Sequence, residues 1–295
     1  MCDDGRAMSQ KDRVMISPLD STVICDSVRP GRILSLWIAA TSVLRGLPLL
    51  LAVRPQTPLR VMCIMAFDTL YRLRTSRKLP IERVRLLAAL LDYGACANAV
   101  CDRKPSPFQE IQTTQRLLDA AGFRPSAEEY WRRIQNIERQ RPGAGGQPMQ
   151  FSIARAYREE VVELSLGVLA TAAFGLEFVD DGIQVVRTEP DLAIVFRIVM
   201  QCQVIDDAVD YSKDTADGLP SFLTSSESLP QAFELTAQVS RNYTDLKNVA
   251  RCAHVLPFRI ALVVVSVIAK LVMTLARWRL ALARSELQPE PTFGP

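Results

Sequence analysis

The hydrophobic pattern of the chain is helical from about residue 31 onwards. Apolar residues recur at spacings of three and four, and few segments alternate strictly between apolar and polar positions. Prolines and glycines fall between the apolar segments, where they end helices. The pattern therefore predicts an all-α fold. The expected helices cover 33–53, 59–78, 80–103, 107–121, 126–140, 148–176, 189–213, 228–252 and 257–286.

Three local patterns add detail to this outline. Ser126 followed by Glu129 matches a capping box, which predicts a helix start at that point. The valine-containing run 184–187 predicts a short, isolated strand. Gly167 interrupts an apolar helix, which indicates a kink, close approach of a substrate, or tight packing of a neighbouring helix.

The domain organisation follows from where the periodicity stops. Residues 1–30 are polar and aperiodic, so we expect a flexible arm. The segment 139–150 could link two domains, but we favour a surface loop because chemically suggestive segments lie on both sides of it. The sequence thus predicts one helical domain over 31–287. The proline-containing tail 288–295 follows it.

Composition restricts the function. Of 295 residues, 48% are hydrophobic and 23% charged, as in globular proteins, and a net charge of +3 gives no argument for a nucleic-acid partner. The single histidine, His254, excludes histidine-rich zinc sites. The seven scattered cysteines, with no CxxC pair, favour reduced thiols and a cytoplasmic location.

Two apolar runs bear on membranes. The runs 33–44 and 260–269 are each shorter than the roughly 20 apolar residues of a spanning helix. Charged or helix-breaking residues follow or bracket them. We therefore expect buried core helices, with peripheral membrane association left open.

The segment 200–222, MQCQVIDDAVDYSKDTADGLPSF, carries a group of aspartates at the end of an apolar helix. Asp206, Asp210 and Asp214 are four apart and share a face, and Asp207 lies beside them. Such like charges repel one another and oppose the helix dipole. A divalent cation, Mg²⁺ or alternatively Mn²⁺, is the obvious compensation. The alternative is a solvated helix end in which Lys213 is the partner.

The segment 86–104, LLAALLDYGACANAVCDRK, is a second apolar helix with polar residues set into it. Asn98 and Asp102 are four apart on one face, and Asp92 lies nearly three turns before Asp102. Small residues around them leave room for a neighbouring helix or a ligand. The alternative is a core helix in which Asp102 pairs with an arginine.

Together the two segments resemble the class I isoprenoid synthase superfamily. QVIDDAVDYSKD (203–214) is similar to the second aspartate-rich motif of polyprenyl synthases, and NAVCDR (98–103) to the first-motif ending DNLCDR of the tetraprenyl-β-curcumene synthase type. Squalene and phytoene synthases share the helical order and a small-residue helix comparable to 157–175. The first motif here has fewer carboxylates, because Ala95 and Asn98 stand where two aspartates are expected.

The resemblance implies a helical bundle around a deep apolar cavity. In it, metal ions ionise a linear prenyl diphosphate, which is then cyclised or deprotonated. The implied metal ligands are Asp92, Asn98, Asp102, Asp206, Asp207, Asp210 and Asp214, of which Asp102, Asp206 and Asp210 are catalytic. The implied diphosphate contacts are Arg103, Lys213 and Arg158, and the implied cavity walls are Tyr93, Tyr157, Phe174, Phe196 and Phe222.

Several alternatives remain open at this point. The same motifs fit a chain-elongating or head-to-head coupling prenyl synthase. The thinned first motif also fits a non-catalytic helical partner subunit with a degraded site, and the apolar runs leave a membrane protein possible. A homodimer is equally compatible with the sequence.

Overall fold

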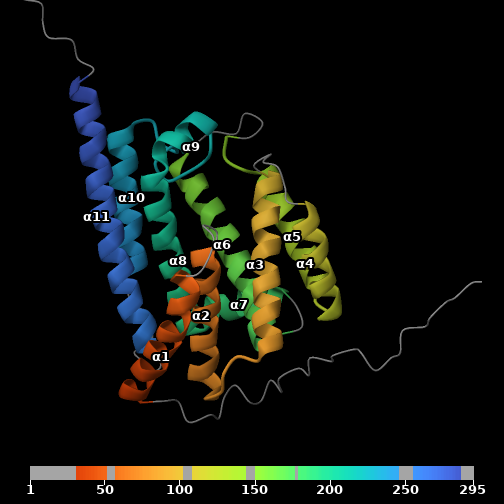
Figure 1. The fold of residues 1–295 in the computed structure, drawn as a ribbon. Helices are drawn as coiled ribbons and strands as arrows, with labels where there is room; N and C mark the ends of the chain where they lie inside the picture. Colours follow the sequence, from red (N-terminus) through yellow and green to blue (C-terminus); the bar gives the residue numbers. More distant parts are fainter. Residues whose placement is uncertain are drawn as a thin grey trace, which may run out of the picture. The chain divides into compact units, whose positions relative to one another are not determined.

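The computed structural model describes residues 31–51, 57–101, 108–143, 150–176, 179–245 and 255–286. Within these ranges every element of regular structure is a helix, which confirms the all-α class (Figure 1). The helices are α1 (Arg32–Leu51), α2 (Thr57–Thr75), α3 (Ile81–Cys101), α4 (Phe108–Ala120), α5 (Arg124–Arg139), α6 (Phe151–Phe174), α7 (Val179–Thr188), α8 (Pro190–Val209), α9 (Tyr211–Asp217), α10 (Leu229–Thr244) and α11 (Leu256–Glu286).

Three local predictions are wrong. The expected helix over 189–213 is divided at Asp210 into α8 and α9, and the expected strand at 184–187 lies in α7. Helix α7 has two acidic residues in its first turn and Arg187 in its last, an order that suits the helix dipole. The capping box at Ser126 does not form, because α5 already begins at Arg124 with a proline in its first turn.

The chain clusters into two compact units. Unit 1 contains Met1–Gln135 and Leu164–Val185, and unit 2 contains Asn136–Glu163 and Val186–Pro295. Helix α6 therefore contributes its first half to unit 2 and its second half to unit 1. The single domain and the deep apolar cavity expected from the sequence stay predictions.

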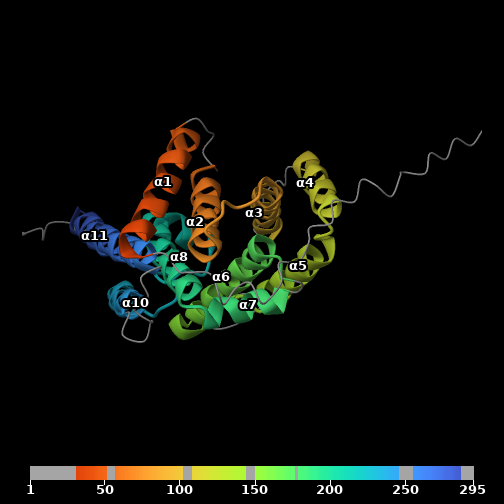
Figure 2. The ribbon, with the colours of Figure 1, turned by 90° about the horizontal axis from the view of Figure 1, so that it is seen from below.

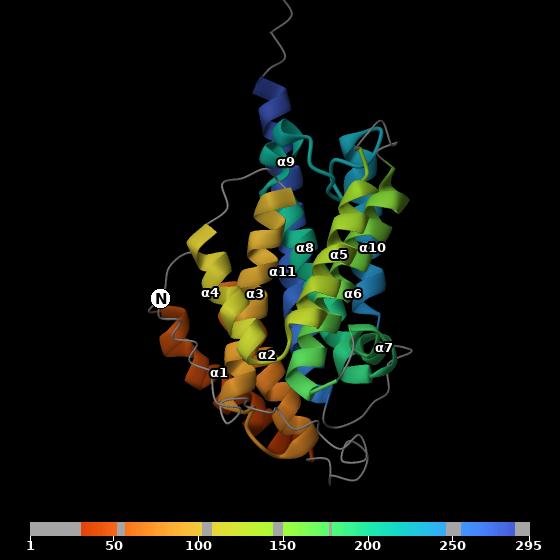
Figure 3. The same ribbon diagram turned by 90° about the vertical axis from the view of Figure 1, so that its right-hand side faces the viewer.

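In unit 1, α2 packs against both α1 and α3, and α3 packs against α4, as Figure 3 also shows for the last pair. The core includes Phe67, Tyr71 and Phe174, whose rings contact one another. Arg83 is buried beside them and donates a hydrogen bond of 2.5 Å to the carbonyl oxygen of Ala173, near the end of α6. Its cation therefore satisfies a carbonyl that the helix leaves unpaired.

Helices α6 and α7 approach closely at two glycines. A Cβ atom at Gly182 would lie 2.0 Å from the carbonyl oxygen of Gly167, and one at Gly167 would lie 2.7 Å from the Ile183 side chain. No larger residue fits either position without moving backbone. Of the three roles considered for Gly167, the structure therefore shows tight packing of a neighbouring helix, α7.

In unit 2, α8, α10 and α11 pack against one another (Figures 1 and 2). The buried face of α8 includes Ile194, Met200 and Val204. Gln201 is also fully buried, and its amide nitrogen donates to the carbonyl oxygen of Ser240 at 2.7 Å. The amide thereby joins α8 to α10 without leaving a buried polar group unpaired.

The expectation that 33–44 and 260–269 form buried core helices is wrong for much of both runs. In α1, Ile33 is 87% exposed and Trp37 66% exposed. In α11, Val263, Val264 and Val267 are all more than half exposed. Within the described part of the chain, the segment Leu256–Leu280 is the one helix long and apolar enough to cross a membrane, judged by length and composition alone.

Candidate functional site

Asp207 is the most buried carboxylate of the acidic segment. Its side chain is 1% exposed, and its Oδ1 accepts a hydrogen bond of 2.9 Å from Arg158 of α6. Its Oδ2 accepts a hydrogen bond of 2.7 Å from the backbone N–H of Phe222. Both carboxylate oxygens are therefore engaged within the protein, so a metal bound to Asp207 would compete with one of these contacts.

Arg158 also joins α6 and α8 to a third segment, the turn at 218–222. Its guanidinium donates to the carbonyl oxygen of Pro220 at 3.0 Å and to Oε1 of Gln203 at 2.6 Å. The chain reaches Pro220 through Gly218, which ends α9 with φ 64°, a conformation that glycine adopts without strain. Arg158 and Asp207 thus fix α6, α8 and the 218–222 turn together within unit 2.

Burial dominates the protonation of Asp207. Loss of hydration raises the pKa of its carboxyl to about 6, while the Arg158 charge and the Phe222 N–H act in the opposite direction. The nearby carboxylates of Asp214 and Asp206 raise the pKa further.

Asp206, Asp210 and Asp214 are the other predicted metal ligands of the same segment. The backbone N–H of Asp210 bonds to the carbonyl oxygen of Asp206, and that of Asp214 to the carbonyl oxygen of Asp210, both at 2.8 Å. The first of these bonds ends α8 and the second begins α9, so the two helices meet at Asp210. Asp206 is exposed, Asp210 is half-buried and Asp214 is buried. The face that the three carboxylates are expected to share stays a prediction.

The charges of these three residues are coupled. Partial desolvation raises the pKa of Asp206, and the carboxylate of Asp210 raises it further. Desolvation also raises the pKa of Asp214, with smaller contributions from Asp210 and Asp206. Within the described ranges none of the three forms an ion pair at salt-bridge distance. The more distant positive charges of Arg158 and Lys213 act on Asp206 and Asp214 and lower the pKa of both.

The described residues contain no cluster of three or more His, Cys, Asp or Glu side chains that could hold a metal ion. Asp206, Asp210 and Asp214 are thus not brought together as a ligand group, and a cation bound by any of them would need further ligands. Mg²⁺ ordinarily takes several from water and from substrate phosphates. The metal assignments to these residues stay predictions.

The first segment is described only in part. Asp92 of α3 pairs with Arg60 of α2 at 2.9 Å, with both side chains 39% exposed. The side chain of Asn98 lies outside the described residues, as do Asp102 and Arg103. Asp92 is thus a partner in a half-exposed ion pair of unit 1, and the roles predicted for the other three stay predictions.

Two of the predicted cavity residues belong to unit 1. Tyr93 contacts the ring of Trp131 at 6.1 Å, and its burial raises the pKa of its hydroxyl. Phe174 stacks on Tyr71 at 6.5 Å, with the Arg74 guanidinium 4.5 Å from its ring centre. Both rings are therefore packed against neighbours within their own unit.

The other three cavity residues belong to unit 2. Tyr157 donates to Glu138 at 2.6 Å, and burial is the main cause of its raised pKa. Phe196 meets Tyr243 edge-on at 6.4 Å, and Phe222 is fully buried. Tyr157 and Phe196 are half-buried, so only Phe222 packs as a core residue, and a role as cavity walls stays a prediction for all three.

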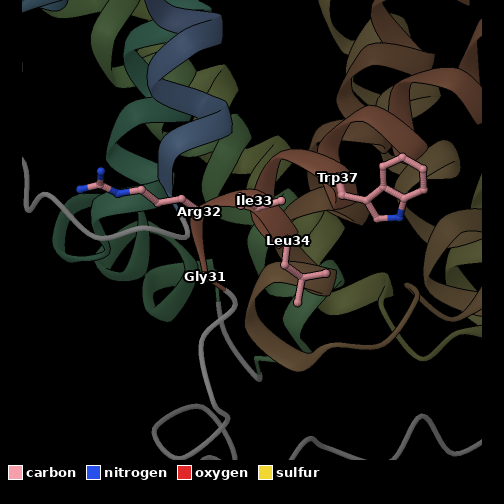
Figure 4. Close-up of a pocket in the computed structure, with 5 residues that line it drawn as sticks. All are labelled: Gly31, Arg32, Ile33, Leu34 and Trp37. Atoms are coloured by element: carbon pink, nitrogen blue, oxygen red, sulfur yellow. The ribbon is translucent and has the colours of Figure 1, made fainter.

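A surface hollow lies at the start of α1 (Figure 4). It is open to solvent and is lined by Gly31, Arg32, Ile33, Leu34 and Trp37. No predicted site residue lines it, and it is distinct from the deep cavity that the resemblance implies.

Sequence reasoning missed how Asp207 and Arg158 are used. The two residues are 49 positions apart in the sequence. The resemblance implies that Asp207 binds metal and that Arg158 binds diphosphate, and it does not imply that they bind each other. The helical spacing gave no signal for this, because Asp207 lies about 100° around the helix from Asp206 but only about 60° from Asp210. The partners themselves come from distant segments.

Comparison with known proteins adds no further assignment. No protein-family model matches the sequence, and neither the curated proteins nor the solved structures contain a match.

Proposed function

We propose that the chain is a class I isoprenoid synthase. It would use Mg²⁺ to ionise a linear prenyl diphosphate and then cyclise or deprotonate the resulting carbocation. The proposal rests on the resemblance of the two acidic segments and on the electrostatics of the second one.

The observation that carries the proposal lies at the end of α8, where Asp207 forms a salt bridge with Arg158 but its neighbouring aspartates have no salt-bridge partner within the described residues. Asp206, Asp210 and Asp214 repel one another, and in the described ranges no salt bridge neutralises them. Asp214 is buried as well. Buried or clustered carboxylates ordinarily need a cation or a proton. Mg²⁺ is the cation that oxygen ligands and a diphosphate favour.

Arg158 supports a diphosphate at the same place. Its Nε is buried and has no hydrogen-bond partner within the described structure, although its other nitrogens are engaged. An unpaired buried donor costs about 1–3 kcal/mol, and a phosphate oxygen would satisfy it. Exposed Lys213 would provide a second, flexible cation.

In this proposal the protein holds charge in place before the reaction. Mg²⁺ bound by Asp206, Asp210 and Asp214 would stabilise the leaving diphosphate as negative charge develops on it. Asp207 would act indirectly, because it orients Arg158 rather than binding metal. A deep apolar cavity, which the proposal also requires, would keep water from the carbocation.

The test is to incubate the purified full-length chain with C10 to C25 prenyl diphosphates and Mg²⁺. Released diphosphate is quantified and hydrocarbon products are read by mass spectrometry. We expect diphosphate release that disappears with EDTA and returns with Mg²⁺. Asp206→Asn combined with Asp210→Asn should abolish the release, whereas Asp217→Asn, an exposed aspartate of α9, should leave it unchanged.

Two results would redirect the proposal. Products that appear only when isopentenyl diphosphate is added, or only from two identical substrates, indicate a chain-elongating or coupling synthase. Absence of metal-dependent diphosphate release from every substrate, with a folded protein, indicates the non-catalytic partner subunit. One observation favours the partner subunit. Asp207 and Asp92 are both predicted metal ligands, yet each forms an ion pair with an arginine of the protein itself.

A further inference from the structure

Helix α11 has two apolar faces, and only one of them is packed within the protein. At about 100° per residue, its buried residues fall on one side of the helix. These are Phe258, Leu262, Ala269 and Met273, and Val255 just before the helix is buried as well. Helices α8 and α10 contact α11. The buried face is therefore accounted for within unit 2.

The second face is exposed. It forms a continuous stripe within an arc of about 140°, centred roughly 180° from the buried face. Its members are between 44% and 72% exposed: Ile260, Val263, Val264, Val267, Ile268, Leu271, Leu275 and Trp278. Monomeric soluble proteins rarely expose an apolar stripe of this length, so it marks an interaction surface. We call this exposed apolar stripe the outer stripe.

Between residues 256 and 285, the charged residues of α11 beside the outer stripe are all positive, and the one acidic residue of the helix, Glu286, is its last residue, about two turns beyond Trp278. The stretch 256–285 contains arginine and lysine but no aspartate or glutamate. Arg259, Lys270 and Arg277 share a position about 100° from the centre of the stripe, along one edge, and Arg279 lies near the other edge. An aliphatic face bordered by basic residues, with a tryptophan near its end, is the composition of helices that lie in a membrane interface.

We propose that α11 binds an anionic lipid surface through the outer stripe. The helix axis lies parallel to the bilayer, the aliphatic side chains enter the boundary between headgroups and acyl chains, and the basic edges contact lipid phosphates. The opposite face stays packed in unit 2. This inference does not depend on the proposed enzymatic activity.

The charge pattern disfavours a second copy of the chain as the occupant. In a two-fold dimer through the outer stripe, the edges that meet are both basic. The stretch 256–285 offers no acidic residue to pair with them. Like charges that approach one another oppose the association.

A membrane-spanning α11 fits less well than a surface-bound one. Lys270 lies near the middle of Leu256–Leu280 and would be placed near the centre of the bilayer. The buried face would also have to leave α8 and α10 or bring them into the lipid. Binding at the surface requires neither change.

The experiment is sedimentation of the full-length protein with phosphatidylcholine vesicles, with and without phosphatidylserine. We expect binding to the vesicles that contain phosphatidylserine, and release when the salt concentration is raised, because salt screens the basic edges. Equal binding to neutral vesicles, or no binding to either, would overturn the proposal.

Charge variants locate the surface. Arg259→Gln, Lys270→Gln and Arg277→Gln together should weaken binding about a hundredfold, from roughly a fivefold loss per basic residue. The matched control, Arg77→Gln, Arg85→Gln and Arg116→Gln, makes the same change of net charge in unit 1 and should leave binding unchanged. Equal weakening by both sets would show that the attraction is not specific to α11 and would contradict the proposal.

A second pair of variants tests the apolar contribution. Val267→Ser and Leu271→Ser replace exposed side chains, so circular dichroism should show an unchanged helical content. Binding should fall more than tenfold, because two aliphatic side chains no longer enter the lipid. Light scattering and alkaline carbonate extraction complete the test. A dimer that these variants dissociate, or protein that carbonate cannot extract from vesicles, would replace the proposal with self-association or membrane spanning.

Discussion

Asp207 and Asp206 are adjacent in the sequence, yet they belong to two different environments at the end of α8. Asp207 is buried, with Arg158 on one carboxylate oxygen and the Phe222 N–H on the other. Asp206 is exposed, and its pKa is raised partly by the negative charge of Asp210. One side of the segment therefore fastens the fold, and the other carries charge that the described protein does not neutralise.

The difference shows what one aspartate-rich motif can contain. A helix places successive residues about 100° apart, so two neighbouring carboxylates need not serve one ligand. Where a carboxylate has both oxygens engaged, removing it should damage stability. Where it faces only other carboxylates, removing it should relieve repulsion and affect ligand binding instead.

The largest expected effect on stability comes from Asp207→Ala. The change leaves the Arg158 cation and the Phe222 N–H without their partner, which should lower the free energy of unfolding by about 3 kcal/mol. Urea denaturation followed by circular dichroism measures the loss. Asp206→Ala, which removes the neighbouring carboxylate, is the matched control and should cost almost nothing. Equal losses in the two variants would contradict the division into two sides.

The pH dependence of stability should separate the same two residues. The raised pKa means that folded Asp207 still holds its proton at a pH where the unfolded chain has released it. Its contribution to stability is therefore greatest below about pH 4 and falls as the pH rises through about 6. The decrease is on the order of 3 kcal/mol for a shift of about two pKa units.

The measurement compares wild type with Asp207→Asn by urea denaturation across this pH range. The asparagine side chain is close in shape to the carboxyl group but does not titrate, so the difference between the two proteins isolates the contribution of Asp207. Wild type should lose stability relative to the variant as the pH rises. A gain would show that Arg158 and Phe222 favour the ionised form enough to lower the pKa.

A double-mutant cycle tests whether Arg158 and Asp207 stabilise the fold through their contact with each other. Arg158→Met and Asp207→Leu should each destabilise the protein, but the double variant should cost less than the sum of the two. The coupling free energy should be about 1–2 kcal/mol, because the second change removes a group that the first had left unpaired. Additive losses would mean that the two residues stabilise the fold independently, in which case the contact at 2.9 Å contributes little.

The all-α class and most helix positions could be predicted from the sequence, because apolar spacing and prolines report local structure. The division of α8 from α9 could not, because neither proline nor glycine marks Asp210 and the apolar pattern runs through Val209. The strand expected at 184–187 failed because four residues are too few to distinguish the two periods.

The site was predictable only to the extent that it is local. Helical spacing predicts a shared face for Asp206, Asp210 and Asp214, but the described residues contain no group of three that could hold a metal ion, and burial is the main cause of the raised pKa of Asp206 and Asp214. The partner of Asp207 lies on another helix, and spacing along one helix says nothing of it. The exposure of α11 was missed for the same reason, because an apolar run does not reveal how many of its faces have neighbours.

The smallest expected effect on stability comes from Asp206, which is exposed. Asp206→Asn removes one of the charges that repel each other and should raise the free energy of unfolding by a few tenths of a kcal/mol. Asp217→Asn controls for loss of an exposed aspartate near the same helix end. The thermal midpoint should then respond differently to Mg²⁺ in the two variants. If Asp206 is a ligand, Mg²⁺ stabilises wild type and Asp217→Asn but stabilises Asp206→Asn less, because a cation that binds only the folded state raises its stability. An identical response in all three proteins would place the cation elsewhere and leave the repulsion at Asp206 as a feature of the fold alone.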